Sequence, residues 1–94
     1  MRSFKEFTAP YVYEILLEIS RGPKRFVDLR RACPNEKTRS RRLKELLRKG
    51  LIKAILIENS KNRPRVHYVL TEKGNKVLIA LNMLAELSSL VEDK

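Results

Sequence analysis

Basic side chains at helical spacing are the residues of this sequence best suited to do chemistry. Steps of about 100° per residue along segment 35–49 turn one set of side chains away from the apolar face of Leu43, Leu46 and Leu47. In the first two turns we expect base-edge contacts with nucleic acid from the outward-facing Lys37, Thr38 and Arg41. Further along the same helix, the side chains expected to hold phosphates are Ser40, Arg42, Lys44 and Arg48. The alternative, an ordinary solvated face, is less favoured because acids at 36 and 45 do not balance the surrounding bases.

Other reactive side chains are few and scattered. Cys33 is the single cysteine, interpreted as a small apolar core residue with a redox switch as the alternative, and His67 is the single histidine, with no clustered ligands near it in the sequence. No nucleophile stands beside a base, no carboxylates pair, and no glycine-rich loop could cradle a phosphate. We therefore expect neither an enzyme nor a metal or cofactor site.

The net charge indicates a polyanionic partner. Twenty-one Lys and Arg against eleven acids give +10, and segment 21–50 alone carries twelve bases and three acids. Nucleic acid fits this balance, whereas an anionic membrane is less favoured because the basic and apolar surfaces fall on different elements. We expect a cytoplasmic protein, because there is no signal-peptide pattern at the start and no apolar run near the roughly 18 residues of a membrane span.

The 94 residues fit one domain, 1–94, with residues 1–8 as an N-terminal arm. Thr8 is predicted to cap a first helix with Pro10 in its first turn, and that helix ends at residues 22–23. A strand stub at 24–26, a short second helix at 27–33 and a third helix at 35–49, capped by Asn35, follow. Strands at 51–57 and 66–70 then form a hairpin, and a helix at 71–92, capped by Thr71, closes the chain. The fold class is mainly α with a small β-hairpin, an α+β winged helix-turn-helix of four helices.

The hairpin tip is the second basic feature. The loop 58–65 is polar and turn-forming, and Lys61, Arg63 and Arg65 are expected to contact the DNA backbone or to enter the minor groove.

The last helix is apolar over most of its circumference, which predicts burial on two sides. A small domain covers one side, so we expect a homodimer whose interface comprises Val77, Leu78, Leu81, Leu84, Leu87, Leu90 and Val91. The alternative is a wide stripe packed only on the protomer's own core.

Three segments carry a family resemblance. The segments are residues 22–31 (GPKRFVDLRR), residues 37–52 with Lys37-Thr38, Ser40, RLKEL and GLI, and residues 64–74 (PRVHYVLTEKG). They resemble HxlR-type winged-helix transcriptional regulators, with MarR and PadR regulators as neighbours. The resemblance spans about 11–85 and implies a dimeric, sequence-specific DNA-binding regulator, paired partly through its terminal helices. The chain departs from the pattern in lacking a cysteine in 1–10, in having Tyr11 where relatives have Trp, and in a longer wing. Arg39 stands where relatives are apolar, and we expect its head to reach a phosphate.

The function predicted is thus a homodimer that binds duplex DNA, with helix 35–49 in the major groove and the wing 58–65 on the backbone or minor groove. Two alternatives are left open: a winged-helix protein-interaction module, and a sequence-indifferent nucleic-acid-binding or architectural protein.

Overall fold

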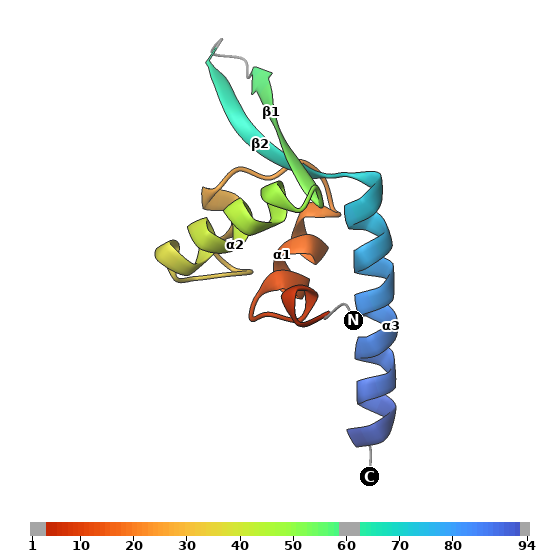
Figure 1. Cartoon of the computed structure of the whole chain (residues 1–94). Helices are drawn as coiled ribbons and strands as arrows, with labels where there is room; N and C mark the ends of the chain where they lie inside the picture. The colour runs from red at the N-terminus through yellow and green to blue at the C-terminus, as the bar shows by residue number, and fades with distance from the viewer. Residues whose placement is uncertain (1–3, 59–62, 93–94) are drawn as a thin grey trace.

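The computed structural model describes residues 4–58 and 63–92, and its extents are 52 × 32 × 24 Å. Within them a 3-10 turn, η1 (Lys5–Phe7), precedes α1 (Val12–Ile19), and a second 3-10 turn, η2 (Val27–Leu29), leads to α2 (Glu36–Arg48). The antiparallel strands β1 (Ile52–Glu58) and β2 (Pro64–Leu70) and the long helix α3 (Glu72–Glu92) complete the fold. Figure 1 shows α1 between α2 and α3, with the hairpin projecting from the end of the body where α3 begins.

The first helix begins later than the sequence predicts. Tyr11 adopts a left-handed conformation with φ of 73°, which a helix cannot contain, so α1 starts at Val12. The predicted cap at Thr8 is therefore wrong: its hydroxyl donates to the Lys5 carbonyl oxygen, at the end of η1.

The predicted second helix at 27–33 is also wrong, so the described residues form three α-helices and not four. Only Val27–Leu29 is helical, and as a single 3-10 turn. Seven residues ahead of a proline are too few to make a helix stable by itself, because the first turn fixes several residues for one hydrogen bond. The strand stub before it is a one-residue bridge in which Lys24 and Tyr68 exchange both backbone hydrogen bonds.

The hairpin has the expected strands in a continuous register, from Ile52 opposite Leu70 to Glu58 opposite Pro64. Its base is anchored, since Leu51 and Ile52 are buried, while the outer residues are exposed. β2 begins at Pro64, two residues earlier than predicted, and Lys61 lies outside the described residues.

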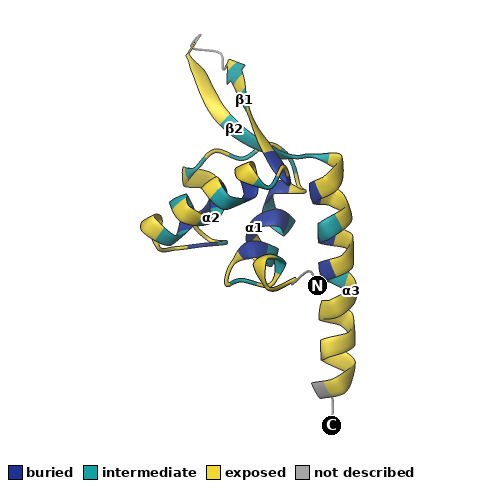
Figure 2. Cartoon of the chain, in the orientation of Figure 1, coloured by how far each residue is buried: buried dark blue, intermediate teal, exposed yellow. Residues whose placement is uncertain are grey.

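One apolar core joins the elements (Figure 2). The four buried residues of α1 form its centre, and α2 adds Leu43 and Leu46, whereas Leu47, expected inside, is 37% exposed. The buried members of this core are Val12, Ile15, Leu16, Ile19, Leu29, Cys33, Leu43, Leu46, Leu51, Ile52, Leu78 and Leu81.

A small polar junction fastens α3 to the end of α2. The Thr71 hydroxyl donates to the Gly50 carbonyl oxygen at 2.6 Å and accepts from the Gly74 amide at 3.0 Å, so the predicted cap is confirmed. Gly74 packs against Leu51, the residue just before β1, so closely that an added Cβ would overlap the Leu51 carbonyl. The T-x-x-G spacing is therefore explained by packing as well as by capping.

α3 is covered along its first half only. Leu78 and Leu81 are 4% and 8% exposed and belong to the protomer's own core, so their expected place in a dimer interface is wrong. Val77 packs partly against the same core. Beyond that point Leu84, Leu87, Leu90 and Val91 are 50–84% exposed, and Figure 2 shows the far half of the helix extending past the body.

Candidate nucleic-acid interface

The N-terminus of α2 is a well-formed helix start at the surface. Asn35 is extended and its side-chain oxygen accepts from the Thr38 amide at 2.9 Å, which confirms the predicted cap. At the other end Gly50 has φ of 74°, the left-handed conformation that glycine adopts readily at a helix end. The first turns of α2, which carry Lys37 and Thr38, are thereby held in helical geometry.

Four basic side chains form a stripe along the outside of α2. Lys37, Arg41, Lys44 and Arg48 recur at i, i+4, i+7 and i+11, the spacing of one helix face, and all four are exposed. Among the residues that the structure describes, none of the four forms an ion pair or a side-chain hydrogen bond. We call these four residues the α2 stripe. Its cationic heads are available to an external anion.

Two other predicted contacts on α2 lie differently. Arg42 donates from Nε to the Pro10 carbonyl oxygen at 2.8 Å and pairs with Glu45 at 3.2 Å, and its side chain is only 13% exposed. Arg42 therefore links α2 to the segment before α1, and Glu45 is occupied by it rather than by the stripe. Ser40 is half-buried at the edge of the stripe.

The hairpin carries its basic residues near the tip. Arg63 and Arg65 are exposed, at the start of β2, and Lys53 is exposed on β1. In Figure 1 the hairpin projects above the body, α2 lies on the flank of the body with its C-terminal end nearest the hairpin base, and the free half of α3 points the other way. The wing arginines therefore lie on the projecting hairpin, and the α2 stripe lies on the helix whose C-terminal end adjoins the base of that hairpin.

Two exposed arginines were missed by the sequence reasoning. Arg30 and Arg31 follow η2 and lie in the irregular segment that leads into α2. Their signal was present in the sequence as two adjacent bases ahead of α2, but the interpretation of 27–33 as a helix drew attention away from it.

The single cysteine does not face this surface. Cys33 is fully buried in the core, and burial raises the pKa of its thiol. His67 is half-buried, with Nδ1 2.9 Å from the Arg65 carbonyl oxygen. No group of three metal-ligating side chains occurs in residues 4–58 and 63–92, and no helix there is long and apolar enough to cross a bilayer.

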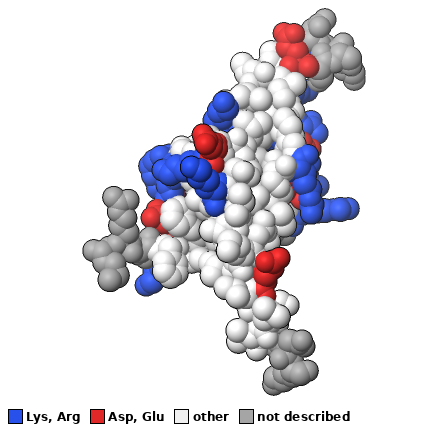
Figure 3. All heavy atoms as spheres, turned by 90° about the vertical axis from the view of Figure 1, so that its right-hand side faces the viewer, with Lys and Arg blue, Asp and Glu red and all other residues white. Residues whose placement is uncertain are grey.

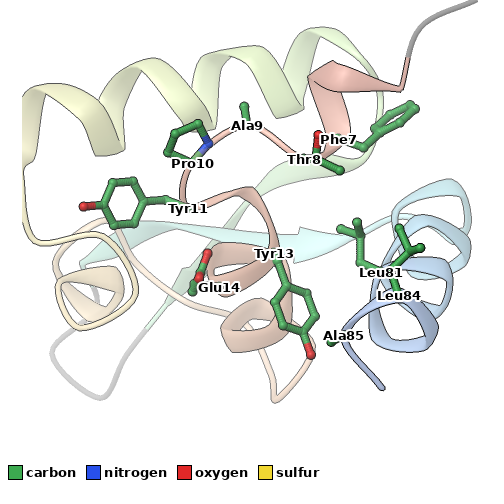
Figure 4. A pocket seen from close by; sticks show the side chains of 10 residues that line it. All are labelled: Phe7, Thr8, Ala9, Pro10, Tyr11, Tyr13, Glu14, Leu81, Leu84 and Ala85. Carbon is green, nitrogen blue, oxygen red and sulfur yellow. The ribbon is translucent and has the colours of Figure 1, made fainter. Parts of the chain in front are cut away.

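A second surface, poor in charged side chains, follows α3. Figure 3 looks onto the α3 side and shows Lys and Arg gathered at the two margins, with a mostly white band between them that carries acidic atoms toward its lower end. Beside this band lies a hollow of about 330 Å³ between α3 and the segment around Tyr13 (Figure 4). Leu81, Leu84 and Ala85 form its α3 wall, and the Tyr13 hydroxyl closes one side by donating to Asn82 at 2.6 Å.

Comparisons with protein-family models and with solved structures point to the same family. A family model described as HxlR-like helix-turn-helix matches residues 9–94. A protein described as a MarR-family transcriptional regulator from Porphyromonas gingivalis W83 is 34% identical, with a TM-score of 0.74, over 96% of this chain and 86% of that one. The diamide-treated YodB of B. subtilis is 25% identical, with a TM-score of 0.74, over 97% and 89% of the two chains.

A further solved structure agrees with these. A protein described as a MarR-family transcriptional regulator from Enterococcus faecalis V583 is 25% identical, with a TM-score of 0.77, over 93% of this chain and 79% of that one. No curated protein matches the sequence.

Proposed function

Since the chain belongs to the HxlR-like helix-turn-helix family of transcriptional regulators, we propose that it works as a homodimer that binds duplex DNA through α2 and the hairpin. The family consists of regulators and not of enzymes, in agreement with the sequence. The observation that carries the proposal is the α2 stripe: four exposed cations on one face of a capped helix, without partners among the described residues. A major groove about 12 Å wide admits one helix in this way.

The proposed division of labour follows the position of each residue along α2. Lys37, Thr38 and Arg41 lie in the first turns and would read base edges, as the N-terminal residues of a recognition helix do. Lys44 and Arg48 would hold phosphates, with Ser40 at the edge of the same contact. In the wing, Lys61, Arg63 and Arg65 would contact the backbone or the minor groove. Arg42 is already engaged by Pro10 and Glu45, so we give it a supporting role.

A second copy is the proposed occupant of the apolar row on the far half of α3. Leu84, Leu87, Leu90 and Val91 form a contiguous exposed apolar row, a surface that soluble monomers rarely leave bare. The neighbouring hollow offers space for a side chain of the partner. A two-fold dimer would present two α2 helices to half-sites about 34 Å apart, which favours a palindromic operator.

Salt dependence tests DNA binding directly. Lys44, Arg48 and two wing arginines amount to about four phosphate contacts per protomer, so the dimer's log affinity should fall with log salt at a slope near −7. The operator is first obtained by selection of bound duplexes from a random library, and its affinity is then measured by fluorescence anisotropy at several salt concentrations. A flat salt response would contradict the proposal, and equal affinity for operator and random duplex would favour a sequence-indifferent function.

A matched pair of variants separates specific contact from net charge. Arg41→Ala should relax sequence preference at one position of the operator. Arg21→Ala removes the same charge from the end of α1, where Arg21 pairs with Glu18, and should leave the preference unchanged. Equal effects of the two would indicate a general electrostatic response.

A further inference from the structure

We propose that Arg39 is a positioning residue that sets the orientation of α2 relative to the segment before it, and thereby the specificity of DNA binding. This inference rests on the proposed function. Arg39 is 3% exposed and is the one buried charged residue within the described part of the chain. Its head therefore does not reach a phosphate, and that sequence-based expectation is wrong.

The guanidinium group has three partners, all on the segment that precedes α2. Nε donates to the Cys33 carbonyl oxygen at 2.8 Å, and Nη2 donates to the Pro34 carbonyl oxygen at 3.0 Å. The guanidinium carbon also lies 4.6 Å from the centre of the Phe26 ring. A buried cation is costly unless its donors are satisfied, and the rigid fork of Arg fits two adjacent carbonyls as an ammonium group would not.

This arrangement compensates for a missing element. Between Val27 and Pro34 the chain forms one 3-10 turn in place of the predicted helix, so this segment offers α2 no full helix to pack against. The carbonyls of Cys33 and Pro34 come just before the cap at Asn35, so holding them also holds the first turn of α2. Arg39 thus ties the base-reading turn to the core through side-chain hydrogen bonds.

The test compares Arg39→Met, which keeps an unbranched stem and removes the fork, with Arg39→Lys, which keeps the charge. Affinities for the selected operator and for random duplex are measured across salt, at a temperature where circular dichroism shows each protein folded. We expect Arg39→Met to lower the operator-to-random affinity ratio by about 10-fold or more, the loss expected from one misplaced base contact. Its random-duplex affinity and salt slope should equal those of the wild type, and Arg39→Lys should lie between them.

Each other outcome has a definite meaning. If the salt slope becomes shallower by about 2 per dimer, with operator and random affinities falling together, Arg39 contacts phosphates and the inference is wrong. If the affinity ratio is unchanged in the folded variants, Arg39 only fills the core. If Arg39→Met does not fold, Arg39→Lys carries the same comparison. A wild-type protein that shows neither salt dependence nor operator preference would reject the proposed function itself, before any variant is compared.

Discussion

Replacing Leu87 by Ala should weaken the dimer without weakening the protomer. Leu87 is 56% exposed on the uncovered half of α3, so about half of its side chain is still available for burial by a second copy. Complete burial of a leucine is worth about 1.5–3 kcal/mol, which leaves about 1 kcal/mol per protomer for the interface. A symmetric dimer contains the substitution twice, so the dimer dissociation constant should rise roughly 30-fold.

Leu78→Ala is the matched control, because it makes the same chemical change about two and a half turns earlier on the same helix. Leu78 is 4% exposed and packed in the protomer's core. Its truncation should lower the free energy of unfolding by about 2–5 kcal/mol, while the dimer dissociation constant of the folded protein changes little. Sedimentation velocity over a concentration series gives the dissociation constant, and urea unfolding below that constant gives the protomer's stability.

The contrast between the two variants decides the matter. An unchanged dissociation constant for Leu87→Ala, with a dimeric wild type, would place the interface elsewhere. A wild type that remains monomeric at high concentration would remove the dimer from the proposal. If Leu87→Ala lowered the protomer's unfolding free energy as much as Leu78→Ala does, the far half of α3 would be packed within the protomer.

Three further outcomes are expected. Gly74→Ala forces a Cβ onto the Leu51 carbonyl, so its thermal midpoint, measured by circular dichroism, should fall by at least about 4 °C; an unchanged midpoint would show that the junction is loose. The Cys33 thiol is buried and its pKa is raised, so a disulfide reagent such as DTNB should react about 100-fold more slowly with folded than with urea-unfolded protein, and comparable rates would contradict this burial. The Arg25 guanidinium holds the pKa of Asp28 below its ordinary value; this stabilisation is present above the unfolded pKa and is lost as pH falls through the folded one. Urea unfolding should therefore show Asp28→Asn slightly less stable than wild type at neutral pH, with the gap closing in acid.

Local signals in the sequence predicted the elements that we propose contact DNA. The predicted ends of α2 lie within one residue of the observed ones, because Asn35 precedes the amphipathic run and Gly50 follows it. The same holds for Thr71 at the start of α3, where a side-chain cap and a glycine three residues on lie within one turn. Such signals work because cap and first turn interact over three or four residues and need no tertiary partner.

The division of α3 into a buried first half and an exposed second half does not follow from the apolar periodicity. It follows from comparing the lengths of α1 and α3. Apolar residues recur along the whole helix, so a wheel cannot separate Leu81 from Leu84. Helix α1 has eight residues and α3 has twenty-one, which are roughly 12 Å and 32 Å at the helical rise. The core built on α1 can therefore cover only the first half of α3, and Leu78 and Leu81 lie in that half.

The inward orientation of two arginines of α2 could not be predicted from the sequence, because both bind backbone carbonyl oxygens, which no residue type marks. Arg39 takes the Cys33 and Pro34 carbonyls, and Arg42 takes Pro10, which is 32 positions away. Six basic residues lie in α2, and these two are consumed inside the molecule. The four that remain are the α2 stripe, at one helix face. The number of bases in α2 therefore does not by itself give the charge of its outer face. That charge also depends on which arginines bind backbone carbonyl oxygens of neighbouring segments. A helix with apolar residues in place of Arg39 and Arg42 would carry the same external stripe without the tie between its first turn and the core.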